Sequence, residues 1–157
     1  MKSKARGLGL CLLTAATLSF PQTVFSQAPP SPAEEVRQAA AAFVAAFNDL
    51  DWSRFTESWD ENATAFPPLK GQPQRIEGRA AIVAAFQQVF GDFPARMSGS
   101  PYLSIQPRDM EVQVEGESAV VTFHLGDSPP FSRRTLVCAR RNGRWSITHL
   151  HASDPPR

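Results

Sequence analysis

A β-hairpin signal in the last thirty residues constrains the fold of this chain more than any other feature. Asn142-Gly143 separates two runs of residues with high β propensity, and a two-residue type I′ turn needs positive φ at both central positions, which these two residue types tolerate. The run after the turn alternates in polarity, which predicts a strand over Trp145–Ser153. Strict alternation would place one set of side chains on each face of this strand: Trp145, Ile147, His149 and His151 on one, and Ser146, Thr148, Leu150 and Ala152 on the other.

Apolar residues nearer the N-terminus recur at the spacing of an α-helix. Ser31-Pro32-Ala33-Glu34 has the form of a capping box with proline in the first turn, which is a strong helix start. The pattern predicts a helix from there to Phe47 and a shorter one over Asp51–Trp59. A third helix is expected to follow Glu77-Gly78-Arg79 and to end near Phe90.

The hydrophobic period changes to two after Tyr102. This period predicts long strands, near Leu103–Val114, Ser118–Leu125, Ser132–Arg140 and Trp145–Ser153, in addition to a brief strand at Ala63–Phe66. Helices followed by antiparallel strands indicate an α+β domain. We expect a cone-shaped domain in which three N-terminal helices pack on a curved antiparallel sheet and leave an internal pocket.

The first residues are typical of a targeting segment. Lys2, Lys4 and Arg6 precede an apolar stretch over 7–20, which is too short to span a membrane as a helix. We interpret residues 1–26 as a secretory signal peptide, 27–32 as a Pro-rich linker and 33–157 as the domain. The expected location is therefore periplasmic or secreted, and the alternative is a leader retained uncleaved as a membrane anchor.

Charge and cysteine content exclude some classes of function. The chain has 16 Lys and Arg against 15 Asp and Glu, and removal of residues 1–26 leaves a net charge of −2, so we expect no nucleic-acid partner. Residues 128–157 nevertheless hold six arginines and only Asp154 as an acid, which indicates either a solvated basic face or an anion site. Cys138 is the only cysteine after the leader, so no internal disulfide is expected, and we interpret it as a core or pocket residue rather than a nucleophile.

Four local patterns carry a resemblance to a known superfamily. They are Thr64-Ala65-Phe66, Glu77-Gly78, Arg140-Arg141-Asn142-Gly143-Arg144-Trp145 and His149-Leu150-His151-Ala152-Ser153. In this order they resemble the nuclear-transport-factor-like superfamily, which includes SnoaL-like cyclases, ketosteroid isomerases and many binding or assembly domains. The pattern is most similar to the association domain of calcium/calmodulin-dependent protein kinase II and its bacterial relatives, over roughly residues 33–153.

The resemblance also predicts which chemistry is missing. The positions that carry the tyrosine and the two aspartates of ketosteroid isomerases correspond here to Phe43, Pro67 and Val137, and none of these side chains exchanges a proton. No Asp or Glu occurs between Ser128 and Ser153, so a SnoaL-type carboxylate on a late strand is absent as well. Isomerase chemistry of that kind is not expected, and whether the protein is an enzyme stays open.

The pocket of the kinase association domains implies a set of site residues. Its histidine and three arginines correspond here to Ile82, His124, Leu136 and Ala152, so only His124 could substitute for a carboxylate-binding group. The same alignment implies a mostly apolar pocket face made by Thr122, His124, Arg134, Leu136, Cys138, Thr148, Leu150 and Ala152. The predicted ligand-binding residues are His124, Arg134, Leu136, Thr148, Leu150, Phe43 and Phe66.

We interpret the three histidines of the chain in different ways. His124 is the best catalytic candidate, because an imidazole titrating near pKa 6.5 serves as acid, base or hydrogen-bond donor, and a core histidine is the alternative. His149 and His151 are a weak metal signal, since a metal site needs at least a third ligand, and no metal or cofactor is expected. The resemblance instead implies a homodimer through an outer sheet face formed by Trp145, Ile147, His149 and His151.

Three functional hypotheses follow from these observations. The leading one is a secreted protein that binds a small, mostly apolar molecule with one polar end in the cone. The second is an acid–base enzyme of the isomerase, dehydratase or cyclase type that uses His124. The third is a homo-oligomeric assembly module without a ligand.

Overall fold

The computed structural model of the protein describes residues 28–69 and 74–155. The predicted signal peptide, 1–26, lies outside the described residues. The helices are α1 (Pro32–Asn48), α2 (Trp52–Glu57), α3 (Arg79–Phe90) and α4 (Phe93–Arg96), and the strands are β1 (Trp59–Phe66), β2 (Ile76–Glu77), β3 (Arg108–Glu115), β4 (Ser118–Leu125), β5 (Ser132–Arg141) and β6 (Arg144–Ser153). Across the described residues, no helix is both long and apolar enough to span a membrane.

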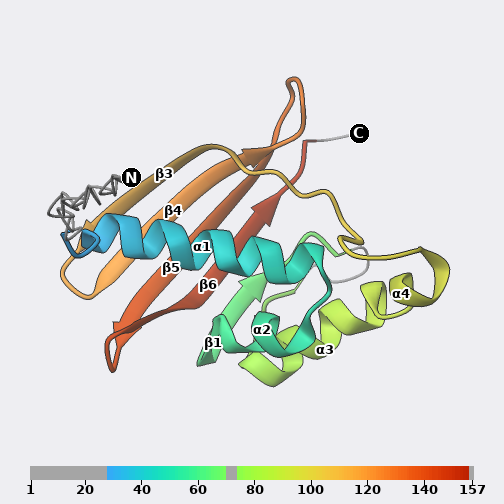
Figure 1. Ribbon diagram of the computed structural model, residues 1–157, viewed down its shortest axis with the longest axis horizontal. Helices are drawn as coiled ribbons and strands as arrows, with labels where there is room; N and C mark the ends of the chain where they lie inside the picture. The colour runs from blue at the N-terminus through green and yellow to red at the C-terminus, as the bar shows by residue number, and fades with distance from the viewer. Residues whose placement is uncertain (1–27, 70–73, 156–157) are drawn as a thin grey trace, which may run out of the picture.

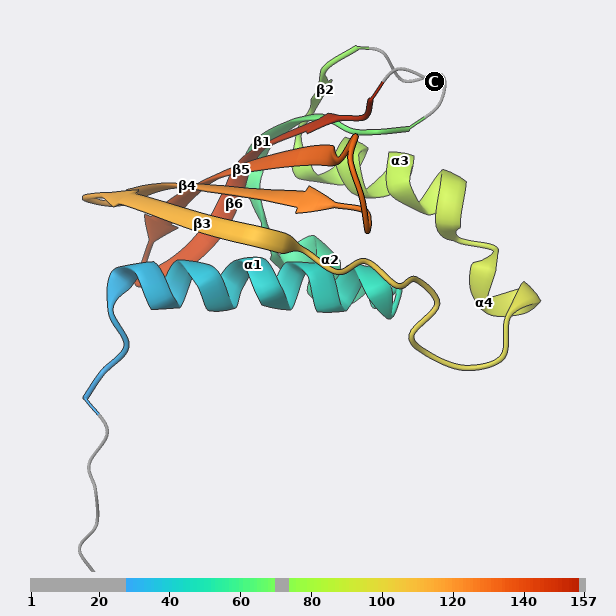
Figure 2. The ribbon, with the colours of Figure 1, turned by 90° about the horizontal axis from the view of Figure 1, so that it is seen from above.

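The strands form one curved, unclosed sheet in the order β2-β1-β6-β5-β4-β3. β1 pairs with β6 in parallel, and every other neighbouring pair is antiparallel. The long helix α1 lies along one face of the sheet, and α2 and α3 lie near β1 (Figures 1 and 2). The α+β cone expected from the sequence is therefore confirmed.

The predicted helix starts are also confirmed. The Ser31 hydroxyl accepts a hydrogen bond from the backbone N–H of Glu34 at 3.3 Å, and Asp51 caps α2 by accepting from the N–H of Arg54 at 3.1 Å. Side-chain oxygens of this kind satisfy N–H groups that have no partner within the helix.

An aromatic cluster joins the helices to the sheet. Phe55 and Trp59 are fully buried, and their ring centroids lie 5.9 Å apart. Phe43 packs on both, with centroids 5.4 Å from Phe55 and 5.6 Å from Trp59. Aromatic rings prefer such tilted or offset contacts, so this cluster fixes α1 and α2 against the start of β1.

The last two strands are joined by the predicted turn. Asn142 has φ +53° and Gly143 has φ +76°, as a type I′ turn requires. The strand predicted from Leu103 instead begins at Arg108. The cause is that the backbone N–H groups of Tyr102 and Leu103 both donate to the carbonyl of Asn48 at the end of α1, so this segment is held by α1 rather than by a neighbouring strand.

A β-bulge in β6 divides the four residues that strict alternation grouped on one face. Cys138 pairs with Ile147, whereas Val137 pairs with His149, so Thr148 is the extra residue of the bulge. Its hydroxyl donates to the carbonyl of Val137 at 3.1 Å. Trp145 and Ile147 therefore face the helices, where they are 7% and 3% exposed, and the prediction that they share the outer face with His149 and His151 is wrong.

The predicted inner face of β4 is wrong as well. Thr122 pairs with Thr135 and His124 with Arg133. Paired residues point to the same side of a sheet, so His124 lies opposite to Arg134 and away from the helices. Val121 and Phe123 occupy the inner face of β4, at 0% and 4% exposure. The cause is the register of the β4–β5 pair, which pairs even-numbered residues of one strand with odd-numbered residues of the other.

Candidate functional site

The inner side of the sheet and the helices enclose an apolar cavity of about 240 Å³, which we call the cone pocket. Phe43 and Phe47 reach it from α1, Phe86 and Phe90 from α3, and Phe123 from β4. The rest of its lining is Val44, Pro68, Ile105, Leu125, Arg134 and Leu150. Small-molecule sites in proteins are typically concave, largely apolar and furnished with few polar groups, and this cavity has that character.

Arg134 is the charged residue of the cone pocket. Its side chain is only 12% exposed, and one of its nitrogens, Nη1, lies 3.1 Å from the Asp154 carboxylate. The same Nη1 donates to the carbonyl of Arg133 at 2.9 Å and lies 3.5 Å from that of Ser153. Among the described residues, its Nη2 and Nε have no hydrogen-bond partner. A guanidinium carries five donor N–H groups, so donors remain for an anionic group in the pocket.

Three of the residues predicted to bind ligand do line the cone pocket: Phe43, Arg134 and Leu150. Leu136 points to the same side of the sheet, because it pairs with Leu150, but it is fully buried in the core. It therefore belongs to the core and does not line the pocket.

The other predicted ligand-binding residues lie elsewhere. Thr148 is the bulge residue and uses its hydroxyl on the backbone of β5. Phe66 is 37% exposed on the outer face of the sheet, where its ring contacts both His149 and His151 at centroid distances of 5.8 Å. His124 also lies on the outer face.

His124 has an orienting partner that the sequence did not reveal. Its Nδ1 lies 3.4 Å from the Asp109 carboxylate, and its ring stacks on Phe131 with centroids 5.3 Å apart. Asp109 has φ +51°, a conformation that is uncommon for residues other than glycine. Because this pair faces away from the helices, His124 does not supply acid–base chemistry to the cone pocket.

His149 is built into the outer face next to β1. Its Nδ1 is 2.7 Å from the Thr64 hydroxyl. Burial lowers the pKa of His149 below its ordinary value, and the nearby His151 and Arg75 lower it further. The neutral imidazole is therefore favoured in the folded protein.

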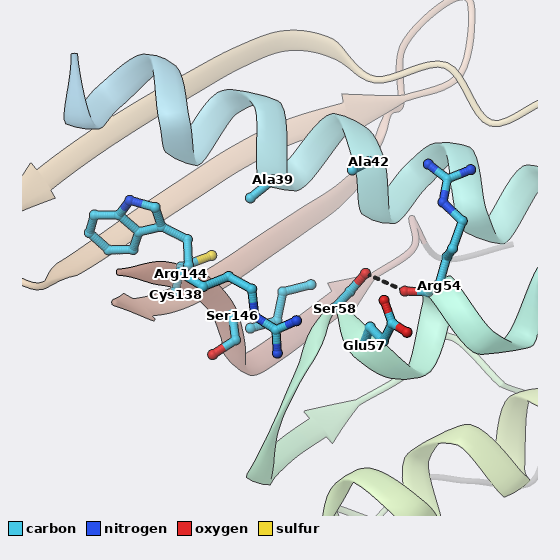
Figure 3. A pocket seen from close by; sticks show the side chains of 10 residues that line it. Ala39, Ala42, Arg54, Glu57, Ser58, Cys138, Arg144 and Ser146 are labelled. Atoms are coloured by element: carbon cyan, nitrogen blue, oxygen red, sulfur yellow. Dashed lines mark hydrogen bonds between the residues drawn. The ribbon is translucent and has the colours of Figure 1, made fainter. Parts of the chain in front are cut away.

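A second hollow, of about 230 Å³, lies between α1, α2 and the strands β5 and β6 (Figure 3). Cys138 and the small residues Ala39 and Ala42 line it, and Arg54 and Glu57 of α2 lie at its edge. Burial raises the pKa of the Cys138 thiol to about 11, so the thiol stays protonated at neutral pH. This agrees with the interpretation of Cys138 as a core or pocket residue.

Glu35 of α1 contacts Trp145, which lines this hollow. Its carboxylate accepts a hydrogen bond from the indole Nε1 of Trp145 at 3.1 Å and lies 3.3 Å from a guanidinium nitrogen of Arg140. The inward position of Trp145 is therefore fixed by a charged hydrogen-bond acceptor as well as by packing.

Reasoning from the sequence missed most of the lining of the cone pocket. Phe47, Phe86 and Phe90 gave a helical hydrophobic period, which marks the buried side of a helix but does not separate core from cavity wall. Phe123 was assigned to the wrong face with the rest of β4. Ile105 carries no local signal, because it reaches the pocket from an irregular segment held by Asn48 through two hydrogen bonds of 2.8 and 3.0 Å.

Solved structures share this fold. An NTF2-like protein of unknown function from Pseudomonas putida has a TM-score of 0.64 and 22% identity, and the match covers 78% of this chain and 86% of that one. The CaMKII hub of S. rosetta has a TM-score of 0.62 and 23% identity, with 80% and 98% covered. The association domain of C. elegans CaMKII has a TM-score of 0.58 and 19% identity, with 77% and 94% covered.

No curated protein matches the chain. Sequence identities this low show a shared fold but do not show a shared activity. The family model described as a SnoaL-like domain matches residues 36–157, the greater part of the described chain. This match agrees with the helices on one face of a curved sheet and with the cone pocket between them. The chain belongs to the SnoaL-like family.

Proposed function

We propose that the protein binds a small, mostly apolar molecule with one acidic group in the cone pocket. The observation that carries the proposal is the lining of the pocket, where aromatic and aliphatic side chains surround one arginine. The apolar body of the ligand would pack against the phenylalanines. The acidic group would accept hydrogen bonds from Arg134.

The environment of Arg134 supports an anionic rather than a neutral polar end. A charge that is mostly removed from water needs a partner, and within 28–69 and 74–155 the one ion-pair partner of Arg134 is Asp154, whose own side chain is 52% exposed. A ligand carboxylate would add a second partner at the free side of the guanidinium. Charge-assisted hydrogen bonds of this type contribute about 1.5–3 kcal/mol each.

The test is a thermal and chemical denaturation screen with small carboxylic acids, each paired with its primary amide. A ligand at 100 times its dissociation constant raises the free energy of unfolding by about 2.7 kcal/mol. The acid should stabilise the protein more than its amide, and Arg134→Gln should remove that difference. If no acid in an aryl and medium-chain alkyl series exceeds its amide, the proposal fails.

Two further variants control the screen. Arg133→Gln removes a neighbouring arginine that lies on the outer face, so acid binding should be unchanged. Asp154→Asn removes the carboxylate that occupies Arg134 without touching Arg134 itself, so acids should bind more tightly. Weaker binding to Asp154→Asn would contradict the role given to the guanidinium.

We also propose that residues 1–26 direct export, so that ligand binding takes place in the periplasm or outside the cell. The basic residues and short apolar stretch at the start of the chain support this location. Cell fractionation followed by N-terminal sequencing of the protein would show a start at Gln27. A cytoplasmic protein that retains Met1 would overturn it.

A second candidate function is self-association through the outer face of the sheet. Phe66 is exposed there, and Val120 and Val137 are paired neighbours on adjacent strands of the same face that are only half-buried. The similar CaMKII hub and association domains are named for assembly. The occupant of this face would be a second copy of the chain.

Sedimentation velocity tests this association. Val137→Lys places a charge in the middle of the outer face and should convert a dimer to a monomer, whereas Gln38→Lys, at an exposed position of α1 on the other side of the sheet, should leave the dimer intact. A wild-type protein that sediments as a monomer at 100 µM would refute the proposal. The original candidates Trp145 and Ile147 are unsuitable for this experiment, because a charge at either position would disrupt the core.

A further inference from the structure

The arginine-rich end of the chain forms a third hollow, which neither the cone pocket nor the outer-face proposal uses. Its volume is about 490 Å³, and it lies where the β5–β6 turn meets the start of β1 and the first residue of α3. We call it the hairpin-end hollow. Its lining is Trp59, Asp60, Glu61, Arg79, Arg141, Asn142, Arg144 and Ser146.

The charges of this hollow are incompletely paired. Arg141 is neutralised by Asp60, with Nε and Oδ2 3.1 Å apart. Arg79 makes only a long contact of 3.5 Å with the carbonyl of Trp59. Neither Arg79 nor Arg144 has an ion-pair partner among residues 28–69 and 74–155. Glu61 is exposed at the edge, and three arginines against two carboxylates leave the lining with a net positive charge.

Ser146 places a hydroxyl in the wall of this hollow. The residue is only 8% exposed and is the one buried polar residue found among those the structure describes. Its hydroxyl makes no hydrogen bond to another described residue. The oxygen itself is not enclosed, because Trp59 Nε1 is the one fully buried side-chain polar atom without a partner among the described residues, so the hydroxyl is open to a group that enters the hollow. Arg144 and Ser146 also line the second hollow, and Figure 3 draws both side chains there.

Trp59 also lines the hollow. Its indole Nε1 is fully buried and has no hydrogen-bond partner in the described part of the chain. Guanidinium and hydroxyl groups at the surface of the hollow donate hydrogen bonds. A hollow with several unused donors and excess positive charge is suited to an oxyanion.

We propose that the hairpin-end hollow binds the phosphoryl or sulfate group of a small molecule through Arg79, Arg144 and Ser146. Arginine is favoured at such sites because its planar fork matches two oxygens of a phosphate at once. The volume exceeds that of a single anion, so the group would be carried by a larger organic body. The site is separate from the cone pocket and does not depend on it.

The test is calorimetric titration of the mature protein with sodium phosphate and with phenyl phosphate at constant ionic strength. Saturable binding is expected, with phenyl phosphate binding more tightly than phosphate and acetate binding more weakly. Arg144→Gln should weaken phosphate binding at least about tenfold, and Ser146→Ala by about threefold. Non-saturable heats that follow ionic strength alone, or tighter binding of acetate, would overturn the proposal.

Matched variants separate this site from general charge and from the cone pocket. Arg133→Gln removes an exposed arginine that has no ion pair among the described residues and does not line the hollow, so phosphate binding should be retained. Arg134→Gln should also retain it, because Arg134 belongs to the cone pocket. Equal losses in Arg133→Gln and Arg144→Gln would show a diffuse basic surface and refute the site.

Vesicles identify the source of the phosphoryl group. Phosphatidylcholine vesicles containing phosphatidic acid should not sediment the protein if the ligand is a soluble monoester. Sedimentation that Arg144→Gln abolishes would support the same contacts with a lipid headgroup as the ligand. Sedimentation that Arg144→Gln leaves unchanged, together with no binding of phenyl phosphate, would overturn the assignment.

Discussion

The two faces of the sheet differ in how deeply their side chains are buried and in how polar these side chains are. The inner face of β5 and β6 places Leu136, Cys138, Ile147 and Leu150 at 4% exposure or less, against helices and the cone pocket. The outer face carries alternating hydroxyl, imidazole and half-buried aliphatic groups. Apolar burial on the inner side holds the domain together, and the same side forms a wall of the cone pocket. The contribution to stability is thus divided unequally between the two sides of the same strands.

Substitution of neighbouring residues on β5 should show this division most strongly. Leu136→Ala removes a fully buried side chain and should cost about 2–5 kcal/mol in the free energy of unfolding. Val137→Ala, on the outer face, should cost less than about 1 kcal/mol. Urea unfolding at low protein concentration measures both, and similar losses would contradict the assignment of faces.

The bulge in β6 decides which residues belong to which face, and its hydroxyl bond should have a smaller effect. Thr148→Val keeps the β-branched shape but removes the bond to the Val137 carbonyl, so the free energy of unfolding should fall by about 1 kcal/mol. Ser153→Ala removes a hydroxyl from the same strand outside the bulge and serves as the control. An unchanged stability in Thr148→Val would show that backbone pairing alone maintains the bulge.

Acidification should produce the smallest effect, and on the outer face only. Because the pKa of His149 is lowered in the fold, the unfolded chain takes up its proton first. The contribution of His149 to the free energy of unfolding is fully present above about pH 6.5. It is lost as the pH falls from there through the lowered pKa of the folded state. His149→Gln should therefore lessen the decline of the melting temperature on acidification. If the melting temperature of the variant declines below pH 6.5 as much as that of the wild type, His149 does not have this role.

Much of the fold could be predicted from the sequence because its signals are local. The Ser31 cap, the Asn142-Gly143 turn and the strand at Ser118–Leu125 each depend on a few adjacent residues. The site was harder to predict from the sequence, since the residues that face a pocket depend on which residues of different strands are paired. One extra residue at Thr148 reversed the face of Trp145 and Ile147, and the β4–β5 register moved His124 to the outside.

Arg134 illustrates the part of the site that sequence reasoning could reach. Its inward position follows from alternation with Leu136 and Cys138 along a single strand, and no long-range register enters. Its partner Asp154 lies beyond β6, and the free donors on its guanidinium depend on that three-dimensional contact. The residue was therefore predictable, and its chemistry required the structure.

The position of β3 at the edge of the sheet also bears on aggregation. An open edge strand is a template on which another chain can add a strand. If two copies paired antiparallel about Gln113, Glu111 of one copy would lie opposite Glu115 of the other, and like charges directly opposite each other oppose pairing. The carboxylates of β3 thus oppose the addition of further copies at this edge, which is the step by which a sheet grows into a fibre.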